Sequence, residues 1–313
     1  MAAAPSPNRD SAESPDSRAA RAGATGARRG TGRRRRAGSV RPTFAATLTA
    51  LNGLAEMGAQ VAVCVQDLDR GDIVLAGDDY VTLPVGGLGV VPLLVEVASQ
   101  VELGTLDPLE IIERPDPVEV GGVWQHLKAP ALPVSDLAVL AASCGDAAAT
   151  NALVARVGLD AVRARADRLG LKNTALLDVF RDRRGPDDAP QLALGSAREL
   201  AGLFAALVNA QAVSAAVSAQ VAEWLTLGHD LSLVGSATGL DPFSHVEDAH
   251  GMLFLNKTGR EAGVRAEAGV LAGPRAGVAY TLIVCFDDLS IMHRLRAHDA
   301  FRTLGTELME YVF

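Results

Sequence analysis

Strand-like segments lie at both ends of the apolar part of this chain, and helical patterns fill the interval between them. Residues 59–79 contain two β-rich runs around an Asp-Arg-Gly turn at 69–71, a pattern that predicts a hairpin. Three more strand-like segments lie near the C-terminus, at residues 251–257, 266–272 and 278–286. Strands interrupted by a long helical insertion predict an α+β fold, with one sheet layer and an all-helical lobe.

The helical patterns set the expected boundaries of the two lobes. They cover residues 92–104, 132–157, 159–169, 197–210 and 218–227, with a further helix from residue 43 and another over residues 290–311. The last strands are joined by short connections, so we expect a mostly antiparallel sheet. We place the sheet lobe at about residues 43–85 and 220–313, and the helical lobe at about residues 86–219. A cleft between two such lobes is the expected place for a ligand.

The first 41 residues differ in composition from the rest of the chain. They contain ten arginines and three acidic residues, whereas the whole chain has a net charge of -8. A segment rich in Ala, Gly, Ser, Pro and Arg cannot bury a core, so we predict a disordered basic tail and a folded domain over residues 42–313. The tail is either a solubilising extension or mis-called start, or an arm for nucleic acid or another acidic partner. The acidic remainder argues against nucleic acid as the main partner.

The cysteines, histidines and apolar runs limit the expected cofactors and location. Cys64, Cys144 and Cys285 are odd in number and far apart, so they indicate neither a zinc site nor a disulfide framework. The six histidines have no ligand spacing, so we expect no metal and no other cofactor. No secretory signal is visible, and no window approaches the roughly 18 apolar residues of a membrane span. We therefore expect a cytoplasmic protein without a membrane partner.

Five stretches in a fixed order resemble the class A β-lactamase and penicillin-binding protein-like serine hydrolase family. They are residues 61–79, 120–142, 145–162, 196–207 and 257–284. The resemblance covers about residues 45–313, nearly all of the predicted folded domain. It implies a β-lactamase-like fold, in which an antiparallel sheet is flanked by helices and joined to an all-helical lobe.

The family's first catalytic motif, Ser-x-x-Lys, is degenerate in this chain. Pro84 and Pro92 bracket the region as the family's prolines often do, which places Gly87 at the serine position and Val90 at the lysine position. Residues 83–97 contain no serine or lysine, so no shift of the register restores the motif. A glycine offers no nucleophile for an acyl-enzyme.

The second motif, Ser-Asp-Asn, is also degenerate. The resemblance places Gly145 at its serine position and Ala147 at its asparagine position. Only Asp146 is retained; it is mainly structural in the family, and we also count it among the expected ligand-binding residues. Cys144 is the only conceivable replacement nucleophile, but no histidine partner is evident. We expect a buried structural thiol there, with a reactive thiol as the alternative. The glutamate of the family's omega loop has no clear match in residues 179–195.

The third motif, Lys-Thr-Gly, is retained as Lys257, Thr258 and Gly259. The resemblance places Lys257 in the cleft, where it sets a positive potential and reaches toward the second motif. Thr258 and Gly259 are expected to line the strand edge that pairs with a ligand backbone.

Two more residues enter the predicted ligand site by resemblance. Arg265 matches a position where relatives bind the ligand carboxylate, and a planar guanidinium suits that role. The alternative is a structural salt network, in which Lys257 and Arg265 pair with Asp146 or Glu267. Trp124 is either a gate beside the cleft or part of the core.

We therefore predict a β-lactamase-related protein that lacks catalytic activity and retains a binding cleft. The expected partner is a small carboxylate ligand or another protein. One alternative is a hydrolase, β-lactamase-like or esterase-like, with chemistry rebuilt around Lys257, Asp146 or Cys144. The other is a structural partner subunit.

Overall fold

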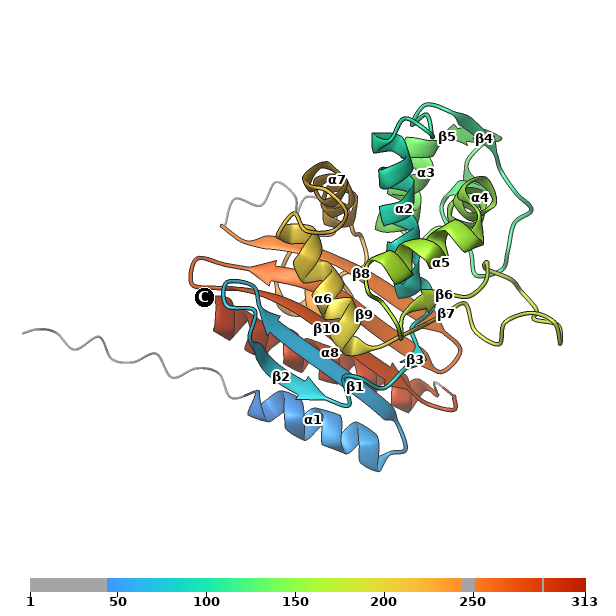
Figure 1. The fold of residues 1–313 in the computed structure, drawn as a ribbon. Helices are drawn as coiled ribbons and strands as arrows, with labels where there is room; N and C mark the ends of the chain where they lie inside the picture. Colours follow the sequence, from blue (N-terminus) through green and yellow to red (C-terminus); the bar gives the residue numbers. More distant parts are fainter. Residues whose placement is uncertain (1–43, 244–250, 289) are drawn as a thin grey trace, which may run out of the picture. The chain divides into compact units, whose positions relative to one another are not determined.

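A computed structural model gives the fold and describes residues 44–243, 251–288 and 290–313. The predicted basic tail at residues 1–41 lies outside the described residues. The central feature is a five-stranded sheet with the strand order β2-β1-β10-β9-β8, in which every neighbouring pair is antiparallel (Figure 1). The strands are β1 (Gln60–Asp67), β2 (Ile73–Gly77), β8 (Leu253–Glu261), β9 (Val264–Ala272) and β10 (Gly277–Cys285). The predicted antiparallel α+β fold is confirmed.

Strands from the early and late parts of the described chain pair inside this sheet, because β1 pairs with β10 along its whole length. Every residue of β10 is buried, as expected for a central strand that is covered on both faces. In β1, Ala62 and Cys64 point into one apolar cluster and Val63 and Val65 into another. This alternation shows that the sheet separates two cores.

Helices cover both faces of the sheet (Figure 1). On one face, α1 (Ala45–Glu56) packs against α8 (Ile291–Val312), and both contact the strands. On the other face, α6 (Ala197–Val208) lies across β1, β9 and β10. The apolar cluster on the α6 side continues without a break into the remaining helices, so the sheet and the helical region share one core.

The helical region comprises α2 (Val91–Glu102), α3 (Val134–Ser143), α4 (Ala147–Val157), α5 (Leu159–Arg168) and α7 (Ala215–Thr226). Helix α2 is central and contacts the other four. The shorter elements are η1 (Gly86–Val90), η2 (Trp124–His126), η3 (Val234–Ala237), β3 (Leu83–Pro84), β4 (Ile111–Glu113), β5 (Ala131–Pro133), β6 (Ala175–Leu176) and β7 (Ala193–Gly195). A buried ion pair between Arg165 and Glu96, 2.7 Å long, joins α5 to α2.

The single helix predicted over residues 132–157 is wrong, because the chain breaks between α3 and α4. Gly145 has a φ of 63°, a left-handed conformation that favours glycine. The next residue, Asp146, then begins α4 by accepting a hydrogen bond from the Ala149 backbone N–H at 2.9 Å. This break brings Cys144 and Gly145 to the edge of the helical region that lies beside β8.

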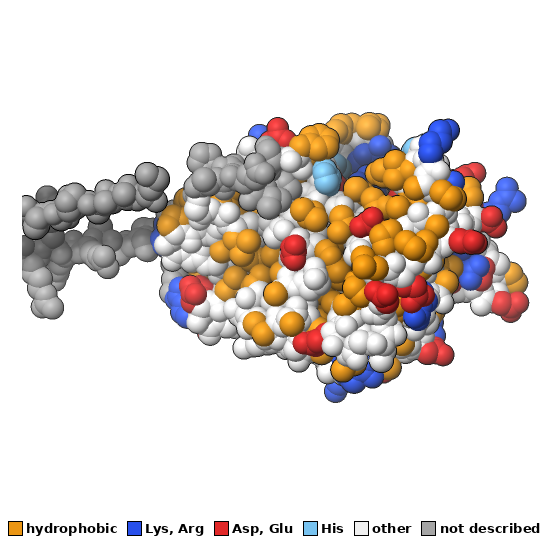
Figure 2. Space-filling view, turned by 90° about the horizontal axis from the view of Figure 1, so that it is seen from above, with side chains coloured by type: hydrophobic (Ala, Val, Ile, Leu, Met, Phe, Trp, Pro, Cys, Tyr) orange, Lys and Arg blue, Asp and Glu red, His pale blue; other side chains and the backbone are white. Residues whose placement is uncertain are grey.

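Among the helices of the described residues, none is both long enough and apolar enough to cross a membrane. Seen from above, acidic and basic side chains lie close to one another around the rim, with apolar side chains between them (Figure 2).

Candidate functional site

A cavity of about 290 Å³ lies beside β8, and several positions of the degenerate motifs surround it. Its walls include Gly87 of η1, Cys144 and Gly145 between α3 and α4, and Lys257 and Thr258 of β8. These segments are far apart in the sequence, so the fold brings together the positions that the resemblance assigned to one site.

Gly87 lies in the 3-10 turn that leads into α2, at the floor of the cavity. A Cβ atom at this position would lie 3.5 Å from the Thr258 carbonyl oxygen, an ordinary van der Waals contact. Val90, at the predicted lysine position, is 1% exposed and belongs to the core. The first motif therefore contributes open space and an apolar side chain, but no reactive group.

Lys257 is the only lysine in the cavity wall, and its side chain is 4% exposed. Among the described residues, none forms a hydrogen bond or ion pair with its ammonium. A Cβ atom on Gly145 would lie 3.3 Å from Lys257 Nζ. A serine at position 145 would thus have pointed toward the ammonium, and the glycine leaves it without that partner.

Burial lowers the pKa of Lys257 to about 8, because the charged form loses its hydration. The negative charge of Asp230 acts in the opposite direction, and the Arg260 guanidinium lowers this pKa further. A thiolate at Cys144 would raise it, which places Cys144 within electrostatic reach of the ammonium. Near neutral pH, Lys257 can therefore be a charged anion receptor or lose its proton.

Asp230 already forms hydrogen bonds with the polar groups next to Lys257. Its Oδ2 accepts hydrogen bonds from Thr258 Oγ1 at 2.7 Å and from Arg260 Nη2 at 2.8 Å. Burial raises the pKa of Asp230, but the hydrogen bonds from Ser232 and Thr258 and the charge of Arg260 more than offset this, so the pKa lies below its usual value. The carboxylate of Asp230 thus takes the contacts that a ligand carboxylate would otherwise find at Thr258 and Arg260.

Arg265 does not share the cavity of Lys257. It lines a neighbouring cavity of about 860 Å³, and Arg260 borders both. In the β8–β9 register, Lys257 pairs with Ala268 and Arg265 with Arg260. The two pairs are three residues apart, which is about 10 Å along the strand. The structure thus places Lys257 and Arg265 in two neighbouring cavities, and their action in one ligand site stays a prediction.

The alternative salt network is wrong. Glu267 accepts hydrogen bonds from Asn256, Tyr280 and the Val234 backbone N–H, and no described cation pairs with it. Arg265 donates to the Val264 carbonyl oxygen. Partial burial lowers the pKa of Arg265, and the nearby arginines lower it further.

Asp146 and Trp124 belong to the scaffold, although both were predicted to bind the ligand. Asp146 is fully buried and accepts hydrogen bonds from the backbone N–H of Trp124, at 2.7 Å, and of Ala149. Trp124 is also fully buried, and its Nε1 donates to the Ala129 carbonyl oxygen at 3.0 Å. Neither side chain reaches the cavity, so Trp124 is part of the core and Asp146 holds two backbone segments together.

Gly259 serves close packing and does not line the cavity. A Cβ atom here would collide with the Val85 carbonyl oxygen, because η1 presses directly on β8. Ala147, at the predicted asparagine position, is fully buried at the start of α4. Cys144 differs from the expected buried thiol, because it is exposed and lines the cavity.

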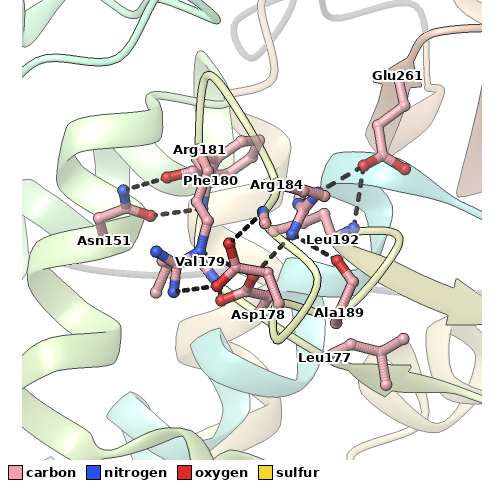
Figure 3. Close-up of polar contacts among 12 residues, drawn as sticks. Asn151, Leu177, Asp178, Val179, Phe180, Arg181, Arg184, Ala189, Leu192 and Glu261 are labelled. Carbon is pink, nitrogen blue, oxygen red and sulfur yellow. Dashed lines mark hydrogen bonds and ion pairs between the residues drawn. The ribbon is translucent and has the colours of Figure 1, made fainter.

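The loop of residues 177–192 contributes Phe180 to the cavity wall, and Asn151 of α4 anchors its backbone at that residue (Figure 3). Asn151 accepts a hydrogen bond from the Phe180 backbone N–H at 2.8 Å and donates to the Phe180 carbonyl oxygen at 2.9 Å. Phe180 borders both cavities. The loop therefore contributes an aromatic ring to the wall of both cavities.

Arginines fix the rest of this loop (Figure 3). Asp178 Oδ2 accepts from Arg181 Nε at 2.9 Å and from Arg184 Nη1 at 2.7 Å. Burial raises the pKa of Asp178, but these arginines and the Val179 backbone N–H hold it below its usual value. Glu261 of β8 accepts from the Leu192 backbone N–H at 3.0 Å and so ties the end of the loop to the sheet.

Among the described residues, no group of three or more His, Cys, Asp or Glu side chains could hold a metal ion. The histidines His245 and His250 lie outside the described residues.

Comparison with known proteins identifies the family and agrees with the fold. The model of the beta-lactamase enzyme family matches residues 43–312. This chain belongs to that family. No curated protein matches the sequence.

Solved structures of the family show the same fold at low sequence identity. A beta-lactamase from Sphaerobacter thermophilus has a TM-score of 0.73 and 20% identity, over 86% of this chain and 97% of that one. A beta lactamase from Xanthomonas campestris has a TM-score of 0.72 and 15% identity, over 88% of this chain and 100% of that one. The structure of PBP-A has a TM-score of 0.67 and 18% identity, over 84% of this chain and 96% of that one.

Sequence reasoning missed three residues of the site: Asp230, Arg260 and Phe180. Arg260 could have been found, because it is two residues beyond Thr258 and so lies on the same face of β8. Asp230 and Phe180 come from loops, and no motif or periodicity distinguishes them in the sequence.

Proposed function

We propose that this protein is a non-hydrolytic member of the beta-lactamase enzyme family that binds a small anionic ligand at Lys257. The observation that supports the proposal is the Lys257 ammonium, which is buried, has no partner among the described residues and faces a cavity with a glycine at the nucleophile position.

The buried Lys257 ammonium carries a free-energy cost. Burying a charge without a partner is unfavourable, and the pKa of about 8 reflects that cost. A carboxylate in the cavity would supply the missing partner, and a charge-assisted hydrogen bond contributes about 1.5–3 kcal/mol. An unpaired buried lysine is therefore what an anion receptor requires in its empty state.

The groups that surround the cavity do not support hydrolysis by the family's route. Gly87 has no hydroxyl to attack a carbonyl, Gly145 has none to relay a proton, and the described cavity lining contains no carboxylate that could act as a general base. The cavity of about 290 Å³ is at the lower end of the range of ligand sites, which favours a small ligand.

A titration tests the proposal directly. A thermal-shift screen of small mono- and dicarboxylates identifies a ligand, and calorimetry then compares the wild type with Lys257→Met and with Lys172→Met, an exposed lysine as control. We expect the Lys257 variant to lose about 10- to 100-fold in affinity and the control to lose none. The wild-type affinity should also fall as the pH rises through about 8, where the ammonium loses its proton.

Two results would contradict the proposal: no stabilisation by any carboxylate, or the same affinity in Lys257→Met as in the wild type. Either result would favour the structural partner subunit. Turnover of a chromogenic cephalosporin by the wild type would instead favour a rebuilt hydrolase. Cytoplasmic location and the lack of nucleic acid and membrane partners stay predictions.

A further inference from the structure

The cavity has a second reactive feature, the exposed thiol of Cys144. The other two cysteines are enclosed: Cys64 is fully buried, Cys285 is 8% exposed, and burial raises their pKa values to about 11 and about 12. Cys144 alone stands at the C-terminal end of α3, in the wall of the cavity that Lys257 faces. Reactive cysteines occur in accessible positions beside a cationic side chain, and Lys257 is the lysine of this cavity wall.

We propose that Cys144 is a nucleophile that accepts an acyl group from an activated ester or thioester, with the Lys257 amine as its proton carrier. This goes beyond ligand binding, because the protein would form a covalent thioester. It does not require the anion-binding function, since the acyl donor need not carry a charge.

The backbone around residue 145 places the two groups together. Lys257 Nζ lies 3.3 Å from the position that a Cβ atom on Gly145 would take, and Cys144 is the preceding residue. Because Gly145 has no side chain, nothing at that residue separates the ammonium from the space beside the thiol. Both residues line the same cavity, and no described carboxylate forms an ion pair with Lys257.

Ser143 orients the thiol. Its hydroxyl donates to the Val139 carbonyl oxygen at 2.7 Å, and its oxygen lies 3.4 Å from Cys144 Sγ. Since the hydroxyl proton is already used, the Ser143 oxygen is left to accept the thiol proton. This contact holds the Cys144 sulfur at the cavity wall.

The proposed step balances in protons and bonds. The neutral Lys257 amine takes the proton of the Cys144 thiol, and the sulfur forms a bond to the carbonyl carbon of the ester. The carbon–oxygen bond to the leaving alcohol then breaks, and the Lys257 ammonium returns the proton to that oxygen. The products are an S-acyl cysteine and an alcohol, and no cofactor or redox partner is required.

Reaction of the full chain with 4-nitrophenyl acetate tests the proposal. We expect one acetyl group per chain by intact-mass measurement, mapped to Cys144, labile to hydroxylamine, and formed together with one equivalent of 4-nitrophenolate. The rate should rise as the pH passes about 8, where Lys257 loses its proton. Cys144→Ala should abolish the label.

Lys257→Met should slow acetylation at least 10-fold, and Lys172→Met should leave the rate unchanged. Iodoacetamide provides a second measurement, since Cys144 should be alkylated at least 10-fold faster than the two buried cysteines. The proposal is overturned if the acetyl group maps to Lys257 or to all three cysteines, or if Lys257→Met reacts at the wild-type rate. Because these readouts do not depend on a carboxylate ligand, their failure is distinct from failure of the anion-binding proposal.

Discussion

Gly87 and Gly89 stand two residues apart in η1, yet the space around them differs sharply. A Cβ atom on Gly87 would make only ordinary contacts, and Gly87 is not among the residues with positive φ. A Cβ atom on Gly89 would collide with the Cβ atom of Ala193 in β7. The position of the lost nucleophile therefore retains room for a side chain.

This difference predicts opposite outcomes for the same substitution. Gly87→Ser should change the free energy of unfolding by less than about 1 kcal/mol, whereas Gly89→Ser should destabilise the protein by about 1–3 kcal/mol through overpacking. Urea denaturation of both variants checks this. Equal losses in the two variants would contradict the space assigned to position 87. Gly87→Ser alone should not restore β-lactam hydrolysis, because Val90 and Gly145 supply no proton carrier.

Lys257 is expected to weaken the fold that contains it. Its folded pKa of about 8 is below the unfolded value of 10.5, so the unfolded chain binds more protons between these values and stability rises with pH there. Lys257→Met should therefore be more stable than the wild type at pH 7, by up to about 3 kcal/mol, and the gain should disappear as the pH approaches 10.5. Thermal melts at several pH values measure this. A variant less stable than the wild type at pH 7 would show that the ammonium has a stabilising partner.

At the scale of elements, the loop of residues 177–192 and β8 form two walls of the site, and they are fixed in different ways. Strand β8 is held by a full antiparallel ladder with β9. The loop forms only isolated contacts, of which the paired hydrogen bonds between Asn151 and Phe180 lie nearest to the cavity. The position of the Phe180 ring thus depends on one side chain of α4.

Asn151→Ala should loosen this loop. Loss of both hydrogen bonds leaves two backbone groups of Phe180 without their partner and should cost about 1–3 kcal/mol. Hydrogen exchange should show reduced protection at the Phe180 amide, with little change in the β9–β10 ladder. Asn209→Ala, at the exposed end of α6, provides the control. Unchanged exchange at Phe180 would mean that the arginines on Asp178 are sufficient to hold the loop.

At the scale of the whole molecule, the folded part is closed by contacts between residues distant in the sequence. Helix α1 is fastened to α8 by Glu307, which accepts hydrogen bonds from the Ala46 and Thr47 backbone N–H groups. The first described helix therefore contributes Leu51 and Leu54 to the core on this face of the sheet.

A chain that begins at residue 42 should melt at the same temperature as the full chain. Residues 1–41 have too few apolar side chains to offset an ordering cost of roughly 1–2 kcal/mol per residue. Calorimetric scans of the two chains measure the difference. A melting temperature several degrees lower in the shortened chain would mean that the basic tail docks on the acidic part.

The sequence by itself determined the type and order of the main elements and the family, because side-chain periodicity and turn residues act locally. It also determined that the serine and lysine of the first motif are absent, since this requires only the residue types near Gly87. The structure alone decided that helix 132–157 breaks at Gly145, because the break depends on a left-handed backbone and on the capping of α4 by Asp146.

Only the tertiary structure decided which groups share the site. Strand register separated Arg265 from Lys257, and loop packing brought Asp230 to Thr258 and Arg260. Exposure of Cys144 likewise depends on how α3 ends beside β8. A site consists of contacts between segments that are distant in sequence, and burial, register and the pKa of Lys257 arise from those contacts and not from any one segment.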